Sequence, residues 1–341
     1  MQNEIKTLEK PKERDSLFDN LKAVGIFLVV LGHMLELINT QPSNIIYKII
    51  YIFHMPLFIF ISGYFSKFNF KTMLKKFIIP FFVIHIVWTL VEYFITTPDS
   101  NFWIYFAKPR WIMWFLFAII IWKLTVPILN KIKKLVPIII ILSFILGLGF
   151  GYLNFDGYLF SISRIVVYYP FFLLGYYFKQ IKFRENKFFK STAVSIILGT
   201  LSIIAIMLFF ILFPSLPREA FYGSYMYNEL SGYSILVRLG KYICSCIIIL
   251  FLISLPSIKI PFLTNLGKYS FEIYLLHGLF VKLLGVWVGY TKTNSFLVMF
   301  IFSVLTTLIC FALSKLYYFI IAKIKDKLKS KKQQKQIQAQ Q

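Results

Sequence analysis

The chain alternates ten long apolar runs with short polar segments. The runs cover residues 17–38, 46–66, 77–97, 111–129, 136–153, 160–178, 191–213, 233–254, 269–289 and 295–321. Each is long enough to cross the hydrocarbon core of a bilayer as a helix. The 341 residues are 58% hydrophobic and only 15% charged, which is too apolar for a soluble domain. The pattern predicts an all-α, polytopic integral membrane protein with about ten transmembrane helices.

The two polar ends of the chain frame this membrane domain. Residues 1–16 are polar, and neither they nor the first span resembles a cleaved signal peptide. We expect a ten-helix membrane domain over 17–322 and a basic tail over 323–341, whose Lys- and Gln-rich composition predicts disorder. No connection exceeds about 20 residues, so no separate soluble domain is expected.

The basic residues gather on one side of the predicted membrane. The net charge is +23, and 26 of the 37 lysines and arginines lie in the two ends of the chain and in alternate connections. The opposite connections hold only Lys48, Lys108, Arg110, Arg218 and Lys292. This positive-inside pattern predicts cytoplasmic N- and C-termini and explains the charge without a nucleic-acid partner. We expect a multi-pass protein of a bacterial plasma membrane, in contact with membrane lipids.

The first span carries four polar side chains on one face: Asp19, Lys22, His33 and Glu36. At about 100° per residue, the step from Lys22 to His33 is three turns plus about 20°, and the two residues lie about 16 Å apart along the axis. Ionisable groups inside a bilayer cost about 2.5–3.5 kcal/mol each on insertion scales, so they usually face the protein interior and serve a site. The alternative is that these residues only pack helices together.

Further candidate residues occur in or beside other spans. They are His54, Lys108, Arg110, Trp111, Trp114, Arg164, Tyr274 and His277. The segment 108–114 suits a cationic aromatic rim or an ordinary snorkelling anchor. Arg164 could bind an anion or snorkel. The tyrosine-rich outer loop 214–232 suits either a carbohydrate or an interfacial aromatic belt.

Other features concern packing and excluded chemistry. Ser62-Gly63 and Gly175 predict that neighbouring helices approach closely. The chain has no HExxH and no clustered Cys/His set, so no metal is expected, and it has no GxSxG nucleophile elbow. Its three cysteines, Cys244, Cys246 and Cys310, lie in apolar spans and are interpreted as small buried hydrophobes.

Several stretches together resemble acyltransferase family 3, the integral-membrane acyltransferases, and most closely its fucose 4-O-acetylase-like branch. They are RDSLFDNLKAVGIFLVVLGH, FHMPLFIFISGYF, WFL at 114–116, YYPFFLLGYYF at 168–178 and LGKYSFEIYLLH. Lys22 and His33 match the family's basic-x10-histidine signature in the first span. Many relatives have arginine where this chain has Lys22, and lysine keeps the charge but lacks the bidentate fork.

The resemblance implies transfer of an acyl group, usually acetyl from acetyl-CoA, to a hydroxyl of a surface or lipid-linked glycan. Some relatives carry a fused extracytoplasmic transferase domain, so this chain is expected to act alone or with a separate partner of that kind. Histidine suits the role of general base, because its unperturbed pKa of about 6.5 is near operating pH. Glu36 could orient the His33 ring and stabilise the imidazolium.

These arguments assign three groups of site residues. They are His33 and Glu36 for catalysis, Lys22 and Arg14 for the acyl-CoA, and His54, Arg110, Trp111, Trp114, Arg164, Tyr274 and His277 for the acceptor. An exporter of polysaccharide or lipid-linked glycan intermediates is the alternative function, because some family members have been proposed as exporters. The polar stripe at acyltransferase spacing favours the enzyme.

Overall fold

The computed structural model describes residues 15–96, 103, 106–109 and 111–338, and all regular structure in this part of the chain is helical. The longer helices are α1 (Ser16–Leu35), α2 (Gln41–Tyr64), α4 (Ile79–Thr96), α6 (Met113–Lys131), α7 (Val136–Gly149), α8 (Ile162–Gln180), α9 (Thr192–Leu212), α10 (Ile235–Ser254), α12 (Ser270–Thr291) and α13 (Phe296–Gln338). The shorter ones are α3 (Phe70–Met73), which continues through the π-turn η1 (Leu74–Ile78) into α4, and α11 (Pro261–Lys268). Single 3₁₀ turns lie between the helices, among them η7 (Arg218–Phe221).

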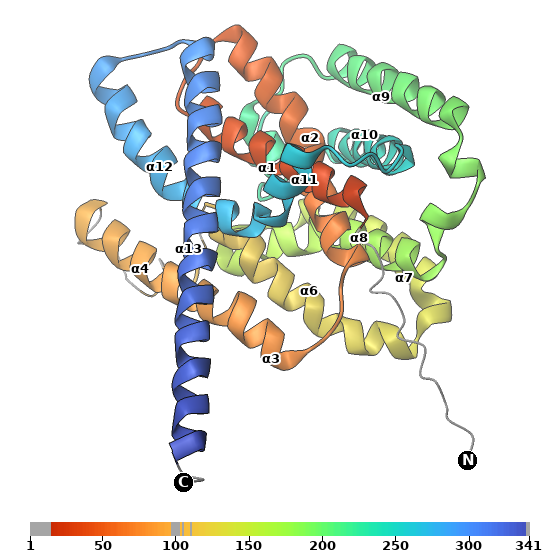
Figure 1. Cartoon of the computed structure of the whole chain (residues 1–341). Helices are drawn as coiled ribbons and strands as arrows, with labels where there is room; N and C mark the ends of the chain where they lie inside the picture. The colour runs from red at the N-terminus through yellow and green to blue at the C-terminus, as the bar shows by residue number, and fades with distance from the viewer. Residues whose placement is uncertain (1–14, 97–102, 104–105, 110, 339–341) are drawn as a thin grey trace, which may run out of the picture.

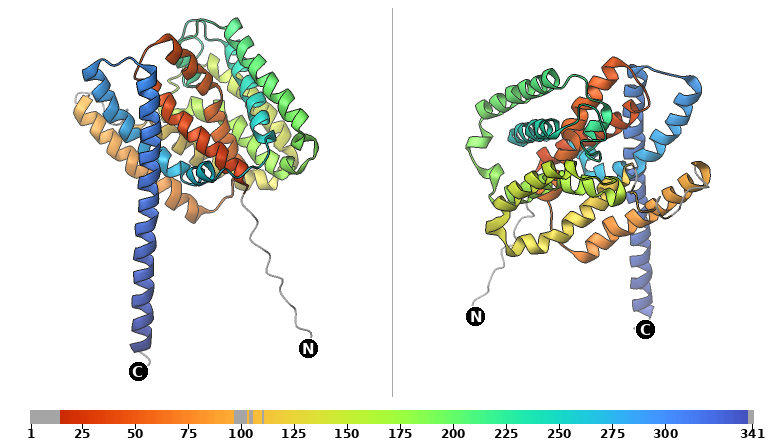
Figure 2. Two further views of the ribbon diagram at one scale, coloured as in Figure 1. Left: turned by 45° about the horizontal axis from the view of Figure 1, so that its top comes forward. Right: turned by 180° about the vertical axis from the view of Figure 1, so that it is seen from behind.

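Ten helices among the described residues are long and apolar enough to cross a membrane. They match the ten predicted spans, so the prediction of an all-α polytopic membrane protein is confirmed. We call the end of the bundle where α1 begins the basic end, because the lysine-rich connections lie there, and the other the far end. Figures 1 and 2 show α13 along one side of the bundle and α9 at the opposite side.

Helix α1 lies at the centre of the bundle. Of its spanning window, 67% is buried, against 17% in α9, which therefore faces the surroundings along most of its length. Helices α2, α11, α12 and α13 pack around α1 (Figure 1). A central helix is shielded from lipid on most sides, so its polar side chains lie inside protein, as the cost of burying charge in a bilayer requires.

Helices α2 and α8 cross at very close range. A Cβ added at Gly63 would lie 2.0 Å from the backbone oxygen of Phe172, and one added at Gly175 would lie 1.9 Å from that of Phe60. Neither position has room for a side chain. The close approach predicted from Ser62-Gly63 and Gly175 is therefore present, and it fixes α2 against α8 beneath the cavities described below.

The short helix α11 is a feature that the hydropathy pattern does not predict. It packs on the first turns of α1, where a Cβ at Gly267 would lie 1.8 Å from the backbone oxygen of Asp19. The Asn20 side chain donates to the Ile258 backbone oxygen at 2.8 Å and accepts from the Thr264 hydroxyl at 2.8 Å. The motif LGKYSFEIYLLH thus spans the end of α11 and the start of α12, rather than one continuous span.

The basic tail also differs from its expected disorder. Helix α13 continues without interruption to Gln338, well past the end of the last apolar run at residue 321. The segment is rich in lysine and glutamine and contains neither glycine nor proline. Lysine and glutamine are good helix formers, so the helix propagates from the membrane span into the tail.

Candidate active site

One stripe of α1 lines two cavities at different depths. Its members follow one another at steps of three or four residues: Asp19, Lys22, Ile26, Val29, His33 and Glu36. The first four line a cavity of about 720 Å³ at the basic end, and the last two line a cavity of about 440 Å³ at the far end. Both volumes are typical of small-molecule sites. We call them the basic cavity and the far cavity. Met55 of α2 lines both.

The stripe ends in a histidine held by a carboxylate. His33 Nδ1 lies 3.1 Å from Glu36 Oε2. The other oxygen of Glu36 accepts hydrogen bonds from the hydroxyls of Tyr51 at 2.6 Å and Tyr47 at 3.0 Å. Since a carboxylate only accepts hydrogen bonds, Nδ1 carries the proton in this contact and Nε2 is the basic nitrogen. The two tyrosines, one turn apart on α2, fix the carboxylate and thereby the ring.

Two aromatic side chains pack against the His33 ring. The Trp111 ring centroid lies 5.0 Å away, and the His277 ring stacks at 5.6 Å with an angle of 26° between planes. Trp111 has φ of 49°, in the left-handed region that costs a non-glycine residue about 1–3 kcal/mol. Such strain is typical of functional sites, and here it accompanies an indole placed beside His33 in the far cavity.

His277 is buried behind His33. Its Nδ1 lies 2.7 Å from the Tyr274 backbone oxygen and therefore donates to it, while its Nε2 has no hydrogen-bond partner among the described residues. His277 lines neither cavity. The structure thus places this residue against the histidine ring, and not on the wall of the far cavity where a bound acceptor would contact it.

The far cavity brings together most of the residues assigned to the acceptor. His54, Trp111, Trp114 and Arg164 all line it together with His33 and Glu36. Tyr274 instead lines the basic cavity, where its hydroxyl donates to the backbone oxygen of Ile112. Arg14 and Arg110 lie outside the described residues.

Sequence reasoning missed several residues of the far cavity. These are Tyr51, Tyr158, Tyr168 and Lys282, whereas Phe221 and Tyr222 belong to the loop 214–232 that the sequence had marked. Tyr51 and Tyr168 lie in apolar spans, where tyrosines are ordinary core residues by pattern alone, and Lys282 falls within a span where no motif marks it. Burial and the nearby Glu36 carboxylate raise the pKa of Tyr222 to about 12, so its hydroxyl remains protonated as a hydrogen-bond donor.

An ion pair closes one edge of the far cavity. Lys108 Nζ lies 2.5 Å from Asp156 Oδ2. Burial raises the pKa of the Asp156 carboxyl, but the Lys108 ammonium and backbone N–H groups of Tyr158 and Leu159 outweigh this effect and hold the pKa below its ordinary value. The carboxylate is therefore charged at neutral pH, and it engages a cation of the cationic aromatic rim at 108–114.

The tyrosine-rich loop over the far cavity is tied down by three cations. Arg218 donates to the backbone oxygens of Leu35 at 3.0 Å and Ile38 at 2.9 Å, at and just beyond the end of α1. Arg238 donates to the Tyr225 oxygen at 3.0 Å, and Lys241 donates to the Ala220 oxygen at 3.0 Å. The loop is thereby fixed beside the helix end that carries His33 and Glu36.

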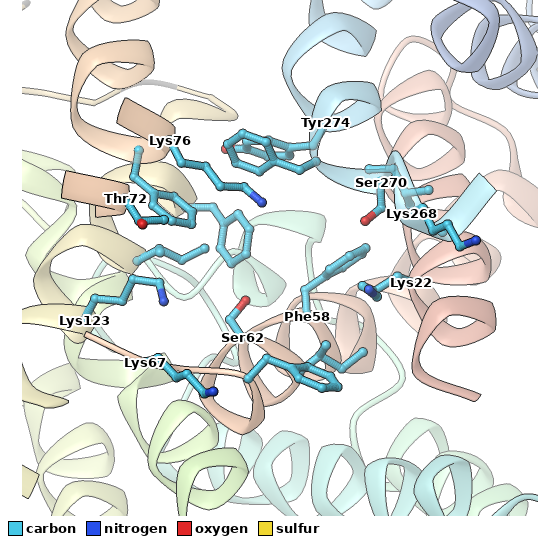
Figure 3. Close-up of a pocket in the computed structure, with 18 of the residues that line it drawn as sticks. Lys22, Phe58, Ser62, Lys67, Thr72, Lys76, Lys123, Lys268, Ser270 and Tyr274 are labelled. Atoms are coloured by element: carbon cyan, nitrogen blue, oxygen red, sulfur yellow. The ribbon is translucent and has the colours of Figure 1, made fainter. Parts of the chain in front are cut away.

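The basic cavity is lined by five lysines: Lys22, Lys67, Lys76, Lys123 and Lys268. In Figure 3, Lys67, Lys76 and Lys123 lie on one side of the cavity, while Lys22 and Lys268 lie on the other. Two aspartates, Asp15 and Asp19, also line it, and Lys22 Nζ lies 2.6 Å from Asp19 Oδ1. The lysines outnumber the acids, so the cavity attracts anions. The charge pattern alone had marked most of these lysines only as topological signals.

The family comparison agrees with this geometry. A family model described as an acyltransferase domain, Acyl_transf_3, matches residues 16–315. The chain belongs to this acyltransferase family. The matched region contains the whole α1 stripe and every residue that lines the two cavities except Asp15, so the family resemblance in the sequence is confirmed at this level.

Two curated relatives are similar to parts of this chain. It is 46% identical over 59 residues to the nodulation protein NolL of Sinorhizobium fredii, covering 16% of each chain. It is 29% identical over 189 residues to the nodulation protein NolL of Mesorhizobium japonicum, covering 49% of this chain and 48% of that one. The chain therefore spans no more than about half the length of these relatives. No solved structure matches.

Proposed function

We propose that this protein transfers an acyl group, with acetyl the first choice, from cytoplasmic acyl-CoA to a hydroxyl of a surface or lipid-linked glycan. The observation that carries the proposal is the α1 stripe, which runs from a lysine-lined cavity to a histidine–carboxylate pair in a second, aromatic cavity. A donor and an acceptor that come from opposite sides of a membrane need such an arrangement. The family supplies the reaction class.

The basic cavity suits the donor. Coenzyme A carries several phosphate charges, and lysines bind phosphate as point charges. With Lys22 at the start of the α1 stripe, a nucleotide held by the lysines would direct its acyl arm along Ile26 and Val29 toward His33. Apolar side chains such as Phe58 and Phe115 line the same cavity and would contact the arm.

The far cavity suits the acceptor. Sugar rings pack their apolar faces on aromatic side chains, and Trp111, Trp114 and Tyr222 supply such faces beside hydrogen-bonding groups. The loop at 214–232 also combines aromatic rings with polar side chains, and it forms part of the proposed acceptor site.

In the proposed mechanism, His33 acts as general base. Its Nε2 takes the proton from the acceptor hydroxyl as that oxygen attacks the thioester carbonyl carbon. The Glu36 carboxylate holds Nδ1 and stabilises the imidazolium. The C–S bond then breaks, the CoA thiolate leaves, and the imidazolium returns the proton to the sulfur. The products are an O-acyl glycan and free CoA.

The test is the His33→Ala substitution. Loss of a general base typically reduces the rate about 10²–10⁴-fold, so the base-labile O-acyl group should disappear from the glycan, as measured by its acetyl methyl signal in NMR. The glycan itself should reach the surface in normal amount. His85→Ala is a matched control, because His85 is a buried histidine of α4 that bonds the Phe106 backbone oxygen and lines neither cavity.

The same experiment distinguishes the enzyme from the exporter. If the His33→Ala cells make fully acylated glycan that fails to reach the surface, the protein is an exporter and the acyltransferase proposal is wrong. A normal degree of surface acylation at normal protein level would also contradict the role of His33.

A further inference from the structure

The far cavity is lined by more cations than the neighbouring acidic side chains neutralise. Its lining includes three cations, Lys108, Arg164 and Lys282, and one acid, Glu36. Lys108 pairs with Asp156, and Glu36 is engaged by His33 and two tyrosines. Among the described residues, no acidic side chain lies within ion-pair distance of Arg164 or Lys282. Two cations therefore face a ligand cavity without a counter-ion from the protein.

The surroundings of Arg164 suit the binding of an anion. Its side chain is only 8% exposed, and its guanidinium carbon lies 5.2 Å from the Trp114 ring centroid and 5.1 Å from that of Tyr158. Nε donates to the Tyr222 backbone oxygen at 3.1 Å. The two terminal amino groups make no hydrogen bond among the described residues. They are not among the fully buried polar atoms that lack a partner, so they are accessible to a ligand. A fixed guanidinium with its fork free matches the two oxygens of a carboxylate or phosphate.

Lys282 approaches the same cavity from α12. It lies five residues beyond His277, about 7.5 Å further along the helix axis, and so still within the span. Its Nζ lies 5.1 Å from the Trp111 ring centroid. A snorkelling lysine would extend to the membrane surface, whereas this ammonium lies over the indole that packs on His33. A lysine at this depth is costly, which favours a functional role.

We infer that the acceptor is an acidic glycan, whose carboxylate or phosphate binds Arg164 and Lys282 while a neighbouring hydroxyl reaches His33. Trp111 contacts both Lys282 and His33, and Arg164 lines the same cavity of about 440 Å³ as these two residues, so an anion bound there shares the cavity with the reacting group. This inference rests on the proposed function. The anion comes either from a uronic-type carboxylate or from a phosphate ester, including that of a lipid-linked carrier.

The first test identifies the charge of the natural acceptor. Membranes from cells with the wild-type chain, and from cells with His33→Ala, are supplied with radiolabelled acetyl-CoA, and the glycans are separated on an anion exchanger. Label that depends on His33 should be retained on the column. Mild acid should release it if a phosphate ester is responsible, whereas reduction of carboxyl groups should release it if a uronic acid is. His33-dependent label in the neutral fraction would overturn the inference, while no His33-dependent label at all would overturn the proposed function.

The second test asks whether Arg164 and Lys282 bind the charged group of the acceptor. With the purified acidic acceptor, Arg164→Gln should raise the acceptor KM about 10- to 100-fold, the worth of a hydrogen bond to a charged group, and leave the KM for acetyl-CoA unchanged. Lys282→Gln should raise it about 2- to 5-fold, and Lys282→Arg should restore it. Lys315→Gln is the matched control, because this lysine of α13 also lies over a ring, Phe311, but lines neither cavity. A fall in kcat with no change in acceptor KM would overturn the assignment and place Arg164 at the oxyanion.

Discussion

At the scale of single residues, the sequence indicates the proposed catalytic pair, His33 and Glu36, but it does not mark the residues that hold this pair in place. His33 and Glu36 share a helix face by spacing alone, and the structure joins them at 3.1 Å. Tyr47 and Tyr51, which hold the carboxylate, come from α2. Tyrosines four apart in an apolar span are indistinguishable from core residues until the two helices are docked.

The charge of Glu36 is the part of this pair that can be tested by itself. Glu36→Gln keeps the size and one hydrogen-bond acceptor but removes the charge that stabilises the imidazolium in the proposed mechanism. A hydrogen bond to a charged group contributes about 1.5–3 kcal/mol, so the acyl-transfer rate should fall about 10- to 100-fold. Initial rates in membranes with matched protein levels measure this effect.

The control for this substitution is Glu185→Gln, which makes the same change in the connection between α8 and α9 at a residue that lines neither cavity. It should leave the rate unchanged. Wild-type activity in the Glu36→Gln variant would show that the imidazolium needs no charged partner, and Glu36 would then serve only to orient the ring.

At the scale of elements, hydropathy predicted the spans and missed what lies between them. All ten long helices follow apolar runs, because exposure to lipid selects for such runs. Helix α11 escaped notice because eight amphipathic residues are too few to span a membrane, although they position the start of α1. The helical tail was missed because a low-hydropathy, lysine-rich composition is shared by disordered segments and by solvated helices.

The crossing of α2 and α8 is a second prediction at this scale. Gly63→Ala would place a Cβ 2.0 Å from the Phe172 backbone oxygen, and a backbone cannot move aside as a side chain can. Overpacking of this kind typically costs about 1–3 kcal/mol, so the unfolding temperature of the protein in detergent should fall. Differential scanning fluorimetry measures it.

Gly149→Ala is the matched control for the crossing. Gly149 lies in α7, and a Cβ there would meet nothing within 4 Å, so the unfolding temperature should stay the same or rise slightly. Equal unfolding temperatures for the wild-type and Gly63→Ala proteins would mean that α2 and α8 separate at no cost, and the close crossing would not stabilise the bundle.

At the scale of the whole molecule, the two cavities could not be located from the sequence. The lysines of the basic cavity come from α1, the connection between α2 and α3, η1, α6 and α11, and they span residues 22–268. No local pattern joins them, whereas the α1 stripe is local and could be predicted. Only the fold shows that the stripe connects a lysine-lined cavity to an aromatic one, which is the feature that the proposed function uses.

The orientation of the molecule in the membrane is the last prediction, and it determines which substrate each cavity can meet. It rests on the 26 basic residues at one side against five at the other. Asn154→Cys, between α7 and α8, and Lys187→Cys, between α8 and α9, lie in exposed connections at opposite ends of the bundle. A membrane-impermeant maleimide should label Asn154→Cys in intact cells and Lys187→Cys only after permeabilisation.

The native cysteines provide a low background for this experiment, since Cys244 and Cys310 are buried and Cys246 is partly buried within a span. The opposite labelling pattern would turn the lysine-lined cavity away from the cytoplasm. Acyl-CoA is made in the cytoplasm, so the donor could then reach only the aromatic cavity that contains His33, and the assignment of donor and acceptor to the two cavities would have to be exchanged. Labelling of both positions from the same side would instead contradict the ten-span topology, because α8 would then not cross the membrane between them.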